Sequence, residues 1–434
     1  MARRHVVIVG GGFGGLAAAH ELRHADVDVT LLDRTHHHLF QPLLYQVAAG
    51  ALAAAECASP IRTALRRNSN TTVLMARATG LDAEKRELIV DRDERLAYDS
   101  LIVACGAQTS YFGKDEWNDV SCGLKTLKDA LEMRNRIYGA FEEAERAHDP
   151  TAQREWMTFV VIGGGPTGVE LAGELAILSA HGMKRGFRRI DPKNARIILL
   201  DAGERLTAAF SERLSGKVAA ELASLGVSVR EGTRVTAIDA HGVSVSGGGE
   251  ERIEARTVIW AAGVQAVGFA GTLAEATGAR TDRAGRIQIK DDLTLDGHPE
   301  ISAIGDTSVL AGKDGKPYPG LATVAIQQGR HVAKAISGGA PGSQTSFHYF
   351  DKGALAVVGR GRAVCEIRGH ELSGRLAFLT YLTVHMYYLG GVRGNRLKVL
   401  IDWIGARLGN PQNQVIEGEL TSVERIPAGA DSAL

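Results

Sequence analysis

Cysteine is scarce in this chain: four occur in 434 residues, and they form no C-x-x-C pair and no metal-ligand spacing. This does not suggest a secreted disulfide scaffold and favours a reducing, cytoplasmic compartment. Net charge is absent as well, because 50 basic residues balance 50 acidic ones, which argues against a nucleic-acid partner. Long apolar runs are also missing, since residues 376–392 are too short and are interrupted by Thr380, Thr383 and His385. We therefore expect no membrane-spanning helix.

Glycine, by contrast, is abundant, at 52 of 434 residues, and two glycine-rich segments repeat one pattern. "VVIVGGGFGGLAAAHEL" begins at residue 6 and "FVVIGGGPTGVELAGEL" at residue 159. Further along, "DVTLLDR" matches "ARIILLDAG", and "YDSLIVACGAQ" matches "ARTVIWAAGVQ". Three landmarks in the same order at similar offsets predict two β-α-β nucleotide-binding domains of related design.

The first repeat has the residues that a dinucleotide site requires. Gly10 permits a tight turn, Gly12 lets backbone amides approach a pyrophosphate, and Gly15 lets the following helix pack against the sheet. Asp33 ends the next predicted strand, where a carboxylate can accept both ribose hydroxyls.

The second repeat places Gly163, Gly165 and Gly168 in the same roles, with Pro166 at the first helical position. Asp201 comes later than the usual spacing because of an insert after the first helix. A carboxylate there would repel the 2′-phosphate of NADPH, which favours NADH, although Arg205 lies close enough in sequence to leave NADPH open.

Two such domains suggest electron transfer from a nicotinamide to a flavin. "TLDGHPEISAIGD" (294–306) resembles the return segment of two-dinucleotide-domain flavoproteins, in which Gly305 and Asp306 reach the flavin. An ordinary Gly-Asp turn is the alternative. The resemblance implies non-covalent FAD on the N-terminal loop and NADH, as substrate, on the second loop.

Five further segments carry a closer resemblance. They are "FQPLLYQVAAG" (40–50), "GGGPTGVELAGEL", "YPGLATVAIQQGRHVA", "HYFDKGALAVVGR" and "HMYYLGGVRGNRLKVLIDW". Together they resemble the type II (alternative, non-proton-pumping) NADH:quinone oxidoreductases, from about residue 5 to 405. The resemblance implies that two electrons pass from NADH through FAD to a membrane quinone without proton pumping.

The implied fold is α/β, with two Rossmann-like dinucleotide-binding domains, the first discontinuous, and a C-terminal α+β membrane-associating region. We expect the FAD domain at residues 1–117 and 284–341, and the NADH domain at 118–283. Residues 342–434 would form the membrane-association and quinone-access region, ending in a flexible tail.

The resemblance also implies the site residues. Those beside FAD are Gly10, Gly12, Phe13, Gly14, Gly15, Asp33, Arg34, Gln41, Pro42, Leu43, Ala104, Gly106, Gly305 and Asp306. Those beside NADH are Gly163, Gly165, Pro166, Thr167, Gly168, Asp201 and Gly263. Those of the quinone run beside the flavin are Ala322, Thr323 and Val324. Catalytic roles in tuning and proton supply are implied for Glu170, Gln327 and Lys352.

For some of these residues a purely structural role is the alternative. Glu170 can be a helix-N-terminal acid that the helix dipole stabilises, and Lys352 can be a turn lysine. Thr323 departs from the A-Q-x-A-x-Q run of the family, and its shorter hydroxyl puts the quinone's orientation in doubt. The His36–His38 tract could suggest a metal, but adjacent residues of an extended chain point in different directions, so we expect none.

The C-terminal stretch bears on the membrane. An apolar helical stripe is formed by Leu397, Leu400, Ile401, Ile404 and Leu408. With basic residues and Trp403 beside it, such a helix can lie in a membrane interface. We expect peripheral attachment to one leaflet on the cytoplasmic side. Packing on the protein's own core and an apolar homodimer interface are the alternatives.

Two other functions remain as rivals. A sulfide:quinone oxidoreductase would share the fold and flavin but would need active-site cysteines, for which Cys122 and Cys365 are candidates. An NADH-sensing flavoprotein that acts by partner binding would share both loops, yet would need neither a quinone pocket nor a membrane surface.

Overall fold

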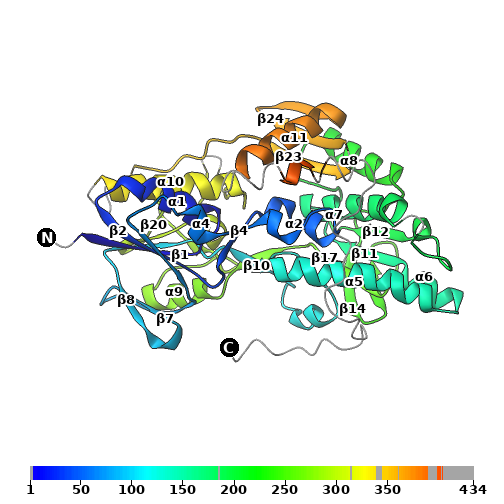
Figure 1. The fold of residues 1–434 in the computed structure, drawn as a ribbon, viewed down its shortest axis with the longest axis horizontal. Helices are drawn as coiled ribbons and strands as arrows, with labels where there is room; N and C mark the ends of the chain where they lie inside the picture. Colours follow the sequence, from blue (N-terminus) through cyan, green and yellow to red (C-terminus); the bar gives the residue numbers. More distant parts are fainter. Residues whose placement is uncertain are drawn as a thin grey trace. The chain divides into compact units, whose positions relative to one another are not determined.

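The computed structural model describes residues 3–183, 186–312, 315–338, 345–359, 361–389, 398–401 and 403. The chain folds into two compact units, each made of separate stretches of sequence. Unit 1 comprises residues 1–39, 58–108 and 264–351, and unit 2 comprises residues 40–57, 109–263 and 352–434 (Figure 1).

Unit 1 is built on a six-stranded sheet in the order β20-β21-β9-β1-β2-β5. Its strands are β1 (Arg4–Val9), β2 (Val27–Asp33), β5 (Thr71–Met75), β9 (Ser100–Val103), β20 (Thr294–Leu295) and β21 (His298–Ala303). All neighbours are parallel except β20 and β21. Smaller sheets pair β3 (His37–Leu39) with β4 (Ala58–Pro60), β19 (Ile287–Gln288) with β22 (Ser308–Val309), and β6 (Ala78–Asp82), β7 (Glu87–Val90) and β8 (Arg95–Ala97).

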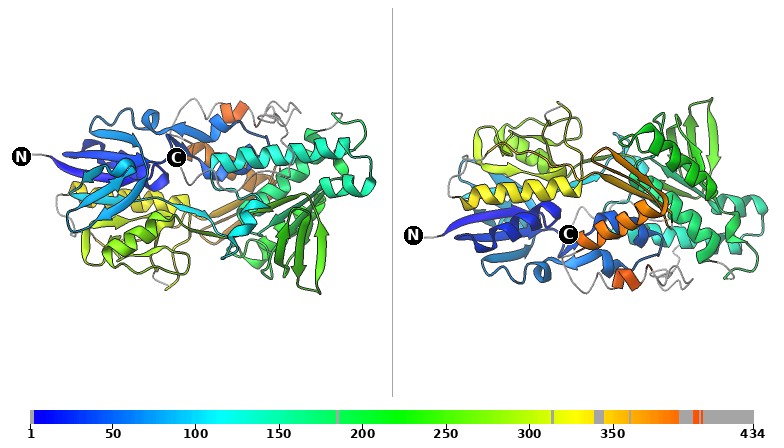
Figure 2. Two further views of the ribbon diagram at one scale, coloured as in Figure 1. Left: turned by 90° about the horizontal axis from the view of Figure 1, so that it is seen from below. Right: turned by 90° about the horizontal axis from the view of Figure 1, so that it is seen from above.

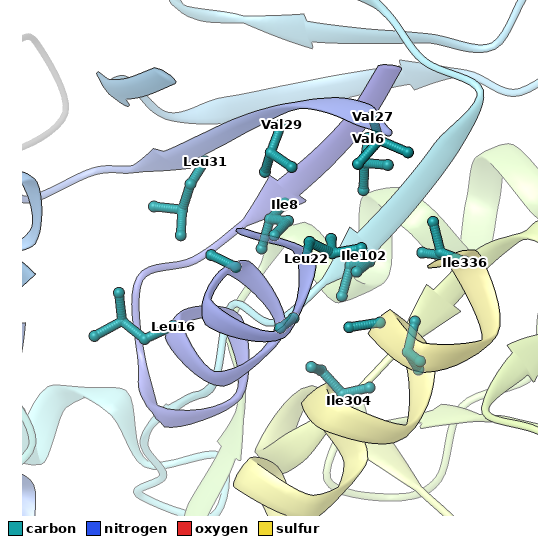
Figure 3. Close-up of a cluster of buried hydrophobic side chains, with 14 of the residues drawn as sticks. Val6, Ile8, Leu16, Leu22, Val27, Val29, Leu31, Ile102, Ile304 and Ile336 are labelled. Carbon is teal, nitrogen blue, oxygen red and sulfur yellow. The ribbon is translucent and has the colours of Figure 1, made fainter. Parts of the chain in front are cut away.

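Both faces of this sheet are covered, which is why β1 is apolar along its whole inner length. One face packs on α1 (Phe13–Glu21) and α10 (Ala322–Ser337), whose side chains join a single buried cluster with β1 and β2 (Figure 3). The opposite face packs on α9 (Phe269–Thr277) and the β6–β8 sheet. A short helix, α4 (Ile61–Ala64), adds Ile61 to the first cluster.

Helices α1 and α10 lie side by side, as the right view of Figure 2 shows, and approach closely at Gly14 and Gly329. A Cβ atom on Gly329 would overlap the carbonyl oxygen of Gly14, so only glycine permits this crossing. The C-terminal side of unit 1 thereby supports the helix that follows the first glycine loop.

Unit 2 contains the second parallel sheet, in the order β13-β12-β11-β17. Its strands are β11 (Thr158–Ile162), β12 (Arg196–Leu200), β13 (Ser228–Arg230) and β17 (Thr257–Trp260). An antiparallel sheet of β14 (Arg234–Asp239), β15 (Gly242–Ser246) and β16 (Glu251–Glu254) packs on one face. On the other, Phe141 of α5 (Leu127–Arg146) meets Phe159 of β11, with ring centroids 5.2 Å apart.

The remaining helices of unit 2 are α2 (Leu44–Ala48), α3 (Ala54–Cys57), α6 (Pro150–Trp156), α7 (Pro166–Ile177) and α8 (Glu212–Ser224). The C-terminal region adds an antiparallel sheet of β23 (Ala354–Gly359), β24 (Arg362–Ile367) and β25 (His370–Ser373), followed by α11 (Gly374–Tyr388). Helix α7 packs on β23 so closely that a Cβ on Gly173 would overlap the carbonyl oxygen of Val358. Short strands β10 (Ala107–Thr109) and β18 (Val264–Ala266) lie where the chain passes from one unit to the other.

The structure confirms the predicted repeat: β1 pairs in parallel with β2 and β9, and β11 pairs in the same way with β12 and β17. It also confirms that the first Rossmann-like unit is discontinuous. Helix α1 begins at Phe13, because Gly12 itself is the N-cap residue. Within the described segments, no helix has both the length and the apolar character that crossing a bilayer requires.

Two candidate dinucleotide sites

The first glycine loop joins β1 to α1 in unit 1. Gly10 has a φ of 109°, and a Cβ there would overlap the carbonyl oxygen of Ala104. A Cβ on Gly15 would overlap the carbonyl oxygen of Gly10, so the helix packs on the turn as predicted. Gly12 faces open space, with no atom within 4 Å of a Cβ built on it, and caps α1 without any side chain. The first turn of α1, which no N-cap side chain covers, and this open side fit a pyrophosphate group.

Asp33 stands beside that loop. Its Oδ2 accepts a hydrogen bond from the Gly11 N–H at 2.7 Å, and its Oδ1 accepts from the N–H and hydroxyl of Thr35 at 2.7 and 2.8 Å. The carboxylate is thus oriented by three donors, and Oδ2 keeps acceptor capacity for a ribose hydroxyl. Arg34 directly follows the strand, and Phe13 meets the ring of His38 edge-on, with centroids 4.9 Å apart.

His38 belongs to this site, although in the sequence the His36–His38 tract suggested only a metal site, which we did not expect. Its Nδ1 bonds the carbonyl oxygen of Gly11 at 3.0 Å, and burial is the main cause that lowers its pKa. Because a carbonyl oxygen can only accept, Nδ1 of His38 is the donor. This hydrogen bond helps to hold the glycine loop in place. No cluster of three or more metal-ligand side chains is found in the part of the chain that the structure describes.

The return segment reaches the same unit through β21. Gly305 has a φ of 66° and donates its N–H to Oε1 of Gln328 at 2.7 Å. Gly106 donates its N–H to the hydroxyl of Thr307 at 2.8 Å. Asp306, Val324 and the buried Gln328 share the lining of an enclosed cavity of about 20 Å³. Gln328 and Thr307 were missed because only their pairing in three dimensions distinguishes them. The one signal in the sequence was the place of Gln328 beside Gln327 in the segment "YPGLATVAIQQGRHVA".

The second glycine loop repeats the first within unit 2. Gly163 has a φ of 111°, a Cβ on Gly168 would overlap the carbonyl oxygen of Gly163, and Gly165 faces open space. Pro166 is the first residue of α7, as predicted, and Thr167 is exposed in its first turn. Gly263 has a φ of 85° and packs under the ring of Phe112.

Asp201 follows β12 directly and matches Asp33 in its bonds. Its Oδ2 accepts from the Gly164 N–H and its Oδ1 from the Gly203 N–H at 2.6 Å. A pocket of about 380 Å³ opens beside it. The lining residues are Gly164, Gly165, Asp201, Gly203, Glu204, Arg205, Thr207 and Ala208. This pocket has room for the adenosine part of a dinucleotide, with the Asp201 carboxylate as an acceptor for a ribose hydroxyl.

Glu170 lies on the inner side of α7, where its Oε1 accepts a hydrogen bond from the Val357 N–H at 3.3 Å. Burial raises the pKa of this carboxyl to about 8. Glu170 therefore holds a proton at neutral pH, unlike a solvated acid at a helix N-terminus. Near it in unit 2, Tyr45 and Tyr381 join their hydroxyls at 3.2 Å, and burial raises the pKa of both.

Two residues of the quinone run make hydrogen bonds to other residues of unit 1. Thr323 bonds the hydroxyl of Tyr349 at 2.9 Å. The amide of Gln327 donates to the Phe350 carbonyl at 3.0 Å and accepts from the Phe350 N–H at 2.9 Å. Ala322 begins α10. In unit 1 the run thus fixes the segment that leads to residue 351.

Other predicted residues belong to unit 2. Gln41, Pro42 and Leu43 form a 3₁₀ turn before α2, and Gln41 donates its amide to the Lys125 carbonyl at 3.1 Å. Lys352 donates to the hydroxyl of Tyr388 at 3.0 Å.

A family model described as pyridine nucleotide-disulphide oxidoreductase matches residues 4–329, and the chain belongs to this class. The type II NADH:quinone oxidoreductase Ndh of Mycobacterium tuberculosis is 43% identical over 423 residues, covering 95% of this chain and 90% of that protein. The chain therefore belongs to the type II NADH:quinone oxidoreductase family, as its motifs suggested.

Two solved structures share the fold. The structure of NDH2 from Plasmodium falciparum in complex with NADH has a TM-score of 0.85 at 20% identity and covers 94% of this chain and 99% of that chain. The sulfide:quinone oxidoreductase from Aquifex aeolicus has a TM-score of 0.73 at 17% identity and covers 90% of this chain and 92% of that chain. At these identities the likeness concerns the fold alone.

Proposed function

We propose that this chain transfers two electrons from NADH to a quinone through bound FAD, without pumping protons. The observation that carries the proposal is the duplicated acid-and-glycine arrangement, in which Asp33 and Asp201 each brace a glycine loop of the same geometry. Two such sites in one chain fit a donor nucleotide and a flavin. Family membership supplies the quinone as acceptor.

The division of the chain follows from the two loops. We assign FAD to residues 1–117 and 284–341 and NADH to residues 118–283. Gly12 and Asp33 would hold the pyrophosphate and ribose of FAD, and the open side of Gly12 fits that group. When bound, FAD supplies the two-electron chemistry that no side chain of the protein provides.

The protein's own residues bind, orient and hold protons. Gly165 and Asp201 would position NADH. Glu170, whose pKa of about 8 keeps it protonated at neutral pH, would supply a proton at its carboxyl oxygen. Lys352 and the run containing Thr323 and Gln327 are assigned to the quinone side. Thr323 offers a hydroxyl that already bonds Tyr349, so we assign it an indirect role in quinone orientation.

Anaerobic reduction tests the function directly. The purified protein would be mixed with NADH, and then with a short-chain quinone, while the flavin absorbance is followed. Rapid loss and rapid return of the flavin band is the expected result. Loss without return would contradict quinone reduction and favour an NADH-sensing protein that acts through a partner.

A sulfide:quinone oxidoreductase is disfavoured by the cysteines. Cys122 and Cys365 are buried, and burial raises the pKa of both thiols, that of Cys122 to about 11. Such thiols are not the exposed thiolates that sulfur chemistry needs. Reduction of the flavin by sulfide, with no response to NADH, would overturn the assignment.

We further propose that residues 342–434 attach the protein peripherally to one leaflet, on the cytoplasmic side. Helix α11 buries only a narrow stripe and exposes Leu376, Leu379 and Tyr387 at 62, 58 and 69%. Two residues of the predicted C-terminal stripe, Leu400 and Ile401, are also exposed. The other three, Leu397, Ile404 and Leu408, lie outside the described residues. This apolar surface supports a lipid contact more than packing on the core.

A matched pair of variants tests the attachment. Leu376→Glu with Leu379→Glu should abolish sedimentation with anionic lipid vesicles, whereas Met75→Glu, at an exposed apolar residue of unit 1, should not. Unchanged vesicle binding together with dissociation of a dimer would instead assign the surface to a homodimer interface.

A further inference from the structure

The loop of residues 203–210, which follows Asp201 in unit 2, forms one wall of the 380 Å³ pocket, and we call it the wall loop. Glu204, Arg205, Thr207 and Ala208 of this loop line the pocket. The role of the wall loop in nucleotide choice rests on the proposed NADH site and concerns the 2′ position of the nucleotide. Arg205 is the one basic side chain among the lining residues, so its direction decides which nucleotide fits.

The guanidinium of Arg205 is committed to the protein itself. Nη1 donates to the Phe210 carbonyl at 2.7 Å and to the hydroxyl of Ser215 at 3.0 Å, and Nη2 donates to the Ala208 carbonyl at 3.0 Å. Ser215 is buried at the start of α8, outside the set of pocket-lining residues. These three bonds use three of the five guanidinium N–H groups and tie Arg205 to its own loop and to α8.

The wall loop is also strained. Thr207 has a φ of 46°, a left-handed conformation that is costly for a β-branched residue. Its N–H nevertheless bonds the Gly164 carbonyl at 2.7 Å, and its hydroxyl is buried with no hydrogen-bond partner among the described residues. Strain of this kind persists only where the surroundings over-determine it. The bonds of Arg205 supply that restraint, together with the Leu206 N–H, which donates to Glu231 at 2.8 Å.

The charges left facing the pocket are negative. Asp201 is fixed by the N–H groups of Gly164 and Gly203, and Glu204 is exposed at the same wall. The structure contains no ion pair between Arg205 and either acid, within the segments it describes. A 2′-phosphate would therefore meet two carboxylates and a guanidinium that is already bonded to the protein, whereas a 2′-hydroxyl can donate to Asp201.

We propose that Arg205 is a positioning residue of the nucleotide pocket: it fixes the wall loop and is thereby withheld from the nucleotide, so that the carboxylates of Asp201 and Glu204 set the preference for NADH over NADPH. The sequence alone suggested the reverse role, a cation that could receive the phosphate. The two roles predict different responses to the same substitutions.

The test is equilibrium binding of NAD⁺ and NADP⁺ to the FAD-loaded protein, which requires neither flavin reduction nor quinone. Arg205→Gln should weaken both nucleotides by the same factor, about tenfold for lost charge-assisted hydrogen bonds, and leave their ratio unchanged. Asp201→Asn should raise the affinity for NADP⁺ relative to NAD⁺ by about tenfold or more, because repulsion is removed. In the Asp201→Asn background, Arg205→Gln should again weaken both nucleotides alike.

Ser215→Ala provides a second, milder variant, because it removes one acceptor of Arg205 together with the long 3.4 Å bond from the Ser215 hydroxyl to the Thr207 carbonyl. It should weaken both nucleotides equally and by less than Arg205→Gln does. A selective loss of NADP⁺ binding in any Arg205 variant would overturn the inference, since Arg205 would then serve the phosphate. Unchanged binding in both variants would overturn it too. Failure of the unaltered protein to bind NAD⁺ at all would overturn the proposed function itself.

Discussion

The carboxylate of Asp33 accepts a hydrogen bond from the Gly11 N–H at 2.7 Å, which links the end of β2 to the loop between β1 and α1. Asp201 and Gly164 repeat this bond in unit 2. The acid that is expected to receive the ribose therefore also fixes the loop that is expected to receive the pyrophosphate, so the two parts of each site are mechanically joined.

Replacing Asp33 should weaken FAD binding in two ways, because Asp33 is expected to bind the ribose and also holds the glycine loop that is expected to bind the pyrophosphate. In Asp33→Asn the amide nitrogen cannot accept, so one set of backbone donors loses its partner, and FAD affinity should fall about 10- to 100-fold. Fluorescence titration of the apoprotein with FAD measures this. Asp28→Asn, at an exposed position of the same strand, is the control and should leave FAD affinity unchanged. Equal affinities for the two variants would contradict the role of Asp33.

The contact of α7 with β23 predicts that alanine substitutions at two glycines will change the free energy of unfolding in opposite directions. In Gly173→Ala the new Cβ would overlap the Val358 carbonyl, so the free energy of unfolding should fall by about 1–3 kcal/mol. Gly216→Ala, in the exposed face of α8 with nothing within 4 Å, should instead raise it by about 0.5–1 kcal/mol. Denaturant unfolding of both variants measures this, and a stabilising Gly173→Ala would show that the two elements are not in contact.

Much of the fold could be predicted from residues close together in sequence. The glycine spacings, Pro166 at the start of α7 and the acids at the ends of β2 and β12 all follow from local backbone requirements, and the structure has each of them in place. Repeat spacing then fixed the parallel pairing, because a β-α-β unit leaves little choice of neighbours.

The supporting contacts could not be predicted in this way. His38 bonds Gly11 across 27 positions of the chain, and Gln328 bonds Gly305 across 23. In neither pair does the sequence around one residue indicate that the other is its partner. Arg205 illustrates the same limit. Its distance along the chain from Asp201 suggested a phosphate ligand, yet its direction depends on Ser215 and on two carbonyls of its own loop.

The raised pKa of Glu170 predicts how stability changes with pH. The folded-state pKa is about 8 and the ordinary value is 4.5, so between them the folded chain holds a proton that the unfolded chain releases. This contribution to stability is fully present below pH 4.5 and is lost as the pH rises to about 8. Glu170→Gln keeps the acceptor for the Val357 N–H and should flatten the decline in unfolding free energy between about pH 6 and 8.

Glu275→Gln, at an exposed position of α9, is the control for that measurement and should follow the unaltered protein at every pH. Unfolding midpoints would be recorded from about pH 6 to 9, which brackets the folded-state pKa. If Glu170→Gln declined as steeply as the unaltered protein, the buried carboxyl would have to be ionised in the folded state at neutral pH.

Two adjacent glutamines of α10 should give opposite phenotypes, because helical geometry turns them to different partners. Gln328 is 3% exposed and accepts the Gly305 N–H, so Gln328→Met leaves that donor without a partner and should weaken FAD binding about tenfold. Among the described residues, Gln327 bonds only the backbone of Phe350, so Gln327→Met should leave FAD affinity unchanged and raise the KM for quinone. FAD titration and steady-state quinone kinetics on both variants separate the two effects. A loss of FAD affinity in Gln327→Met as large as in Gln328→Met would place both side chains on the flavin side of the helix.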